Sequence, residues 1–158
     1  MPEKKKNGLA HLESATDERL LKIKPPAFIS RTPRSIKQMK LRKTSEWLAW
    51  LLFCCLPCLI GILKDHQVIH LAMPSRAPYL LLQKSVSQEN VNEAHDLFLC
   101  YANLVQKNFG EREMVYNMHL LQHIAQGVLN YGPLFTHNAL IFEGENRHLL
   151  ELCKAPIC

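Results

Sequence analysis

One pair of cysteines and one pair of histidines in this sequence have spacings that could support redox chemistry or metal binding. Cys55 and Cys58 fit the Cys-x-x-Cys pattern, which can lower a thiol pKa for redox exchange or supply two zinc ligands. A redox role needs a strand before the motif and a βαβ unit after it, and a zinc site needs two more ligands, but the sequence shows neither pattern. Because cysteine is often buried, the sequence favours packing in a leucine-rich hairpin.

His119 and His123 are four residues apart on an expected helix, so they should share one face. Helical metal sites use this geometry. The text His-Leu-Leu-Gln-His lacks the glutamate that follows the first histidine in metalloproteases. Metal binding and a structural place on the rim of a core helix both stay open, and the second is the commoner use of such a pair.

An acidic cluster follows near the end of the chain, where Glu143, Glu145 and Asn146 fall within one helical turn. Carboxylates can hold Mg²⁺, but such sites generally combine carboxylates from distant positions. Taken alone, the cluster indicates a helix N-terminus, where the dipole favours acids.

The strongest charge run has six bases and no acid: Arg31, Arg34, Lys37, Lys40, Arg42 and Lys43. Residues 1–46 hold 12 basic and 5 acidic residues, a net charge of +7, whereas residues 47–158 carry −2. This asymmetry indicates a phosphate backbone or anionic lipid as partner, or else a solvated leader. Because the run lacks interleaved aromatics, DNA binding through it should not depend on base sequence.

The elements that must position these residues are expected to be helices, because no long alternating strand pattern occurs. Residues 1–20 are predicted to be a disordered polar leader, and residues 21–46 a basic connector held extended by prolines. A helix should start at Thr44 or Ser45, ahead of Glu46. The six cysteines do not form a secreted disulfide pattern and no signal peptide is visible, which predicts a reducing compartment, nucleus or cytoplasm.

The apolar run from Trp47 to Leu63 has 17 residues, close to the lower limit of about 17 for a membrane span. Pro57 and Gly61 interrupt it, so two short buried helices hinged near Pro57 explain the run as well as a single span does. The membrane interpretation therefore stays as an alternative.

Three further helices are expected after this run. Pro74 and Pro78 should break or kink the first. Ser87 should cap the second and Gly110 should end it. The third should run from Met114 to Leu129, before a turn at residues 130–133. The second helix carries the clearest apolar stripe, formed by Val91, Ala94, Phe98, Tyr101, Val105 and Phe109.

Several segments in order resemble one family: "IKPPAFISRTPRS", "SEWLAWLLFCCLPCLIGIL", "YNMHLLQHI" and "YGPLFTHNALIFEGEN". Over about Leu21 to Leu152 the chain is similar to the C-terminal part of transposase-derived proteins of animal genomes, related to CACTA (En/Spm-like) DNA transposons. The resemblance implies a cut-and-paste enzyme with an RNase H-like core, in which two Asp and one Glu hold two Mg²⁺ or Mn²⁺ ions.

On this resemblance the chain supplies a helical insertion over 47–152 and the last acid, and residues 153–158 form a tail. Glu143 matches the third carboxylate, with Asn146 in the same motif, and His119, His123 and His137 match the family's histidines. Nothing in residues 1–46 resembles the strands that carry the two Asp. We therefore expect a truncated transposase fragment that binds DNA and is inactive alone. Its expected protein partners are a full-length transposase or another helical protein. A domesticated helical interaction module is a further alternative.

Overall fold

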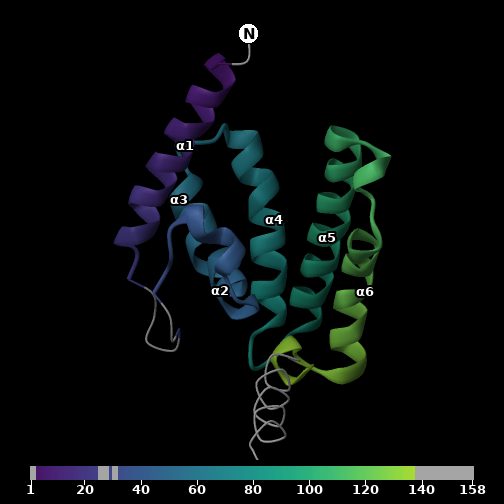
Figure 1. Cartoon of the computed structure of the whole chain (residues 1–158). Coiled ribbons are helices and arrows are strands. Elements are labelled where there is room, and N and C mark those ends of the chain that lie inside the picture. Colours follow the sequence, from purple (N-terminus) through teal and green to yellow (C-terminus); the bar gives the residue numbers. More distant parts are fainter. Residues whose placement is uncertain (1–2, 25–28, 30–31, 138–158) are drawn as a thin grey trace, which may run out of the picture.

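The computed structural model describes residues 3–24, 29 and 32–137. Across these residues the chain is mostly helical and contains no β-strand, which confirms the predicted mostly α fold. Helices α4 (Asp65–Leu81), α5 (Gln88–Phe109) and α6 (Tyr116–Tyr131) pack in succession. Figure 1 shows the N-terminal elements α1, α2 and α3 on the side of α4 away from α5 and α6.

The predicted disordered leader is instead helix α1 (Glu3–Lys22). Its C-terminal half packs against the rest of the chain, because Leu20 is fully buried beside Cys54 and Cys58. The Arg19 guanidinium also donates to the backbone oxygens of Cys58 and Ile60. The expectation of disorder rested on polarity alone, and one well-placed leucine and one arginine dock this helix.

The apolar run forms a helical stretch in three parts, namely α2 (Thr44–Ala49), the π-helical turn η2 (Trp50–Cys54) and α3 (Cys55–Leu59). The predicted start at Thr44 is confirmed. This helical stretch is irregular at the π turn just before Pro57. Proline has no backbone N–H to donate, and its ring crowds the carbonyl one turn earlier. None of the helices described is long and apolar enough to cross a membrane.

Of the predicted break or kink, the break is wrong, because α4 runs through both Pro74 and Pro78 as one helix. A proline inside a helix costs about 3 kcal/mol or more. Packing offsets this cost, since α4 lies between two layers and buries Ala77, Leu80 and Leu81. The Ser75 hydroxyl, also buried, donates to the Leu51 carbonyl in the π turn at 2.7 Å.

The ends of α5 follow the sequence signals. The Ser87 hydroxyl accepts a hydrogen bond from the Asn90 amide at 3.2 Å, which satisfies one free donor of the first turn. Gly110 ends the helix with a φ of +94°, a left-handed conformation that glycine adopts without strain. The predicted stripe is correct except at its end, where Phe109 is 66% exposed.

The described residues form two separate hydrophobic cores. The larger core joins α4, α5 and α6 around the buried Phe98 and includes Ala125 and Val128 from α6. The smaller joins α1, η2 and α3 around Leu20, Cys54 and Cys58. The basic segment lies next to the smaller core, because Ile36 packs against it.

Candidate nucleic-acid interface

The basic segment folds as a short 3-10 helix, η1 (Ile36–Leu41), which α1 holds in place. The Ser35 hydroxyl accepts from the Lys37 amide at 3.2 Å and donates to the Asp17 carboxylate. The same carboxylate accepts from the Ile36 amide at 2.7 Å. Asp17 therefore fixes the start of the basic segment, a role that its place in a polar leader did not indicate.

Arg34 and Arg42, two of the predicted DNA-binding residues, make contacts inside the protein. Arg34 Nε lies 3.0 Å from Glu46 Oε1, and the Glu46 side chain is only 9% exposed. The contact is an ion pair without hydrogen-bond alignment, since this buried oxygen has no hydrogen-bond partner. Glu46 Oε2 accepts from the Lys43 amide at 2.8 Å and so caps α2.

Arg42 makes two further internal contacts. Its Nη2 donates to the Arg34 carbonyl at 2.7 Å. Its guanidinium carbon lies 5.2 Å from the ring centroids of both Trp47 and Trp50, within the range of a cation–π interaction. Arg42 therefore joins the basic segment to the apolar helix that follows it.

Lys37, Lys40 and Lys43 are the bases of this segment that remain available to a partner. All three are exposed and form no ion pair with any residue that the structure describes. Arg31 lies outside the described residues. The candidate interface is thus three lysines over seven residues, which we call the lysine face.

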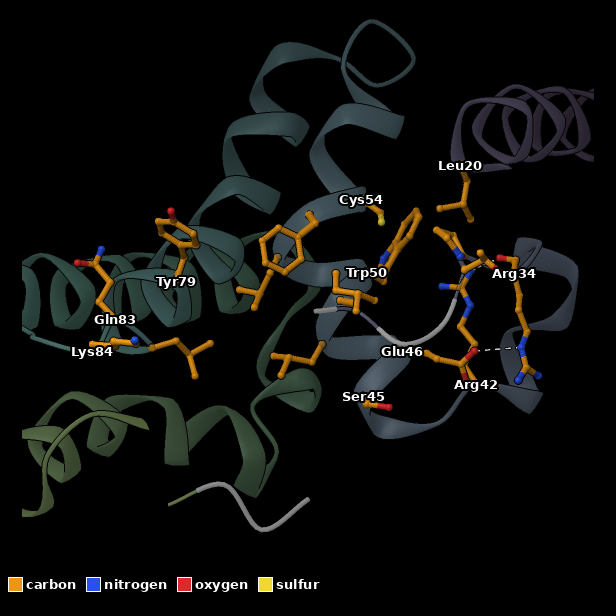
Figure 2. A pocket seen from close by; sticks show the side chains of 18 residues that line it. Leu20, Arg34, Arg42, Ser45, Glu46, Trp50, Cys54, Tyr79, Gln83 and Lys84 are labelled. Atoms are coloured by element: carbon orange, nitrogen blue, oxygen red, sulfur yellow. Dashed lines mark hydrogen bonds and ion pairs between the residues drawn. The ribbon is translucent and has the colours of Figure 1, made fainter. Parts of the chain in front are cut away.

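A pocket of about 550 Å³ lies beside this segment. Arg34, Arg42 and Glu46 are at one end and Tyr79, Gln83 and Lys84 at the other, as Figure 2 shows. Apolar side chains also line the pocket, among them Leu20, Leu48, Ala49, Leu52, Phe53 and Leu82. Sequence reasoning did not find this pocket, because its walls come from segments distant in the chain.

His119 and His123 lie together, as their spacing predicts. Their Nε2 atoms are 3.2 Å apart and both side chains are exposed on α6. His137 is separate from them: its Nε2 lies 3.2 Å from the Gly132 carbonyl and 3.0 Å from the Thr136 hydroxyl. It therefore closes the turn after α6.

The acidic motif with Glu143 and Asn146 lies outside the described residues. Among residues 3–24, 29 and 32–137, no three His, Cys, Asp or Glu side chains form a group that could hold a metal ion.

The Cys-x-x-Cys motif is packed, as the sequence favoured. Cys54, Cys55 and Cys58 are free thiols and all three are buried. The pKa of the Cys58 thiol is raised to about 11, chiefly by burial and also by its neighbours Cys54 and Cys55. Redox exchange and zinc binding both need a thiolate, so this environment opposes them.

Comparisons of the chain with models of protein families, with curated proteins and with solved structures find no match.

Proposed function

We propose that this chain is a helical piece of a CACTA-related transposase that binds DNA without sequence specificity and has no catalytic activity alone. The transposase origin rests on the ordered sequence motifs. In this proposal Glu143 is the third carboxylate of an RNase H-like site that uses Mg²⁺ or Mn²⁺, and the two Asp are not in this chain. The place of action is the nucleus, or the cytoplasm as a second reducing compartment.

The observation that supports DNA binding is the exposure of the lysine face. Its three ammonium groups have no carboxylate partner among the described residues, so phosphate oxygens can approach without displacing an internal ion pair. Arg34 and Arg42 are less suitable for this test, because their removal would also break contacts inside the protein. Charge without aromatic platforms gives binding that is electrostatic and independent of base sequence.

The test is the salt dependence of duplex DNA affinity for Lys37→Gln, Lys40→Gln and Lys43→Gln combined. The slope of log K against log salt should become shallower by about 2.7, because each phosphate contact contributes about 0.9. The matched control combines Lys64→Gln, Lys84→Gln and Lys107→Gln, which removes the same charge from exposed positions elsewhere. It should change the slope by less than about 1. Equal effects of the two triple variants would show that only net charge matters. The proposal that the lysine face binds DNA would then be wrong.

A second candidate function is a helical interaction module, and the pocket of about 550 Å³ favours it. The pocket places apolar side chains of the Trp47–Leu63 run next to solvent, where a partner helix could cover them. Leu52 and Phe53 are two of these side chains and come from the π turn. A second copy of the chain is the partner that can be tested directly.

If this second candidate is correct, the purified chain should elute in size-exclusion chromatography with a mass above that of a monomer. Leu52→Asp should return it to the monomer, because a charge in the pocket would be buried by the partner. The control is Leu129→Asp, an exposed position on α6 that does not line the pocket. A wild-type chain that is a monodisperse monomer at all concentrations would count against this function.

A further inference from the structure

The Nε2 atoms of His119 and His123 lie close together on the exposed surface of α6. Their Nε2 atoms are 3.2 Å apart, and the rings lie with centroids 4.8 Å apart at an interplanar angle of 73°. In a neutral imidazole one ring nitrogen carries the proton and the other has a free lone pair. With the proton on Nδ1 in both rings, both Nε2 lone pairs are free to engage one metal ion.

The separation of the two nitrogens matches the edge of a metal coordination polyhedron. Zinc–nitrogen bonds are about 2.0–2.1 Å long, and two such bonds at a tetrahedral angle place their nitrogens about 3.3 Å apart. The observed 3.2 Å is close to this value. Because both side chains are exposed on a regular helix, an ion can reach them without any rearrangement of the core.

Another histidine pair shows that spacing alone does not produce this arrangement. His66 and His70 are also four residues apart on one helix, α4. The His70 ring, however, stacks on Tyr101 with a centroid distance of 4.8 Å and lies 6.5 Å from the ring of Phe109. These ring contacts hold His70 in place, so it is not free to turn toward an ion beside His66.

We infer that His119 and His123 form a two-nitrogen site for a divalent transition-metal ion of the class Zn²⁺, Ni²⁺ or Cu²⁺. Imidazole suits these ions, whereas Mg²⁺ and Mn²⁺ prefer oxygen ligands, so the site is independent of the carboxylate chemistry proposed above. The described part of the chain offers no third ligand. The remaining coordination positions are therefore open to water or to ligands from another molecule.

The test is Ni²⁺ and Cu²⁺ binding to the full chain, measured by titration calorimetry, with nitrogen hyperfine structure in the Cu²⁺ electron paramagnetic resonance spectrum. The wild type should show coordination by two imidazoles. His119→Ala and His123→Ala should each lose about tenfold or more in affinity. Loss of a metal ligand should cost at least as much affinity as loss of a residue that hydrogen-bonds to a ligand. His66→Ala is the matched control and should leave binding unchanged.

A rescue variant separates the metal site from a general effect on folding. Gly127 lies four residues after His123 on α6, and a Cβ atom added there would lie in open space. Gly127→His in the His119→Ala background would recreate the pair one turn further along and should restore affinity and the two-nitrogen spectrum. The inference is overturned if the wild type shows no two-nitrogen signal, if His66→Ala removes binding, or if the rescue variant stays weak.

Discussion

At the scale of single residues, burial decides which reactive side chains can act. Cys58 is fully buried beside Leu20, whereas Cys100 on α5 is exposed. Transfer of a thiolate into an apolar site is costly, so the buried thiol keeps its proton. The motif that looks most reactive in the sequence therefore contributes packing, and its chemistry is suppressed by the fold.

This burial predicts how stability depends on pH. The pKa of Cys58 is raised from its ordinary value of 9.0 to about 11, so between these values the folded chain holds a proton that the unfolded chain has lost. The stabilisation is fully present below pH 9 and is lost as pH rises toward 11. Urea unfolding across this range should show a smaller loss of stability in Cys58→Ala than in the wild type. Cys100→Ala should behave like the wild type, and an unchanged pH slope in Cys58→Ala would contradict the prediction.

The sequence could predict the basic segment but not how its members divide between structure and binding. The six bases look alike in the text, yet Arg34 and Arg42 make internal contacts and three lysines do not. The partner of Arg34 is Glu46, twelve positions later, and no periodic pattern links the two. The histidine pair was easier to predict, because four-residue spacing puts both side chains on one face of a helix. Contacts with other elements then decide whether the two rings meet, as the stacking of His70 on Tyr101 shows.

At the scale of elements, tertiary packing overrules local preference in α4 and α1. Pro74 and Pro78 predict a break or a kink, and a polar leader predicts disorder. Helix α4 is nevertheless unbroken and α1 is helical, because neighbouring elements hold them. By contrast, the ends of α5 were predictable. The Ser87 cap and the Gly110 stop act through the backbone within one turn, so they do not depend on distant contacts.

Docking of α1 should depend mainly on Leu20. Leu20→Ala removes a fully buried side chain from the smaller core and should cost about 2–5 kcal/mol. Hydrogen exchange should show lost protection in α1, α2 and α3, with protection kept in α4, α5 and α6. Leu21→Ala is the matched control, because Leu21 is 60% exposed and its loss should cost no more than about 0.5 kcal/mol. Equal effects of the two variants would show that α1 is not docked as described.

At the scale of the whole molecule, two cores divide the described chain into a three-helix layer and an N-terminal cluster. The fold class was predictable because helical periodicity is strong over α5 and α6. The division into two cores was not, because Leu20 and Cys58 are far apart in the sequence and meet only through the fold. The pocket beside the lysine face has the same origin, since its walls belong to α1, α2, η2 and α4.

The proposed lack of catalytic activity concerns the whole chain. Cleavage by two metal ions needs carboxylates that hold both ions, and one glutamate does not provide them. The purified chain should therefore leave supercoiled plasmid intact with Mg²⁺ or Mn²⁺, measured by agarose gel electrophoresis. Metal-dependent nicking that Glu143→Ala abolishes would show that this judgement is wrong. Nicking that persists in Glu143→Ala would indicate a contaminating nuclease.

The hydrogen bonds from Ser35 and Ile36 to the Asp17 carboxylate link the docking of α1 to the arrangement of the lysine face. One carboxylate on α1 holds the first residues of the basic segment, so the charge density of the lysine face depends on a helix that itself carries none of those lysines. Undocking of α1 would release η1 and let the three ammonium groups spread apart by mutual repulsion. By thermodynamic reciprocity, a polyanion that binds the gathered lysines more tightly than the dispersed ones must in turn hold α1 in place.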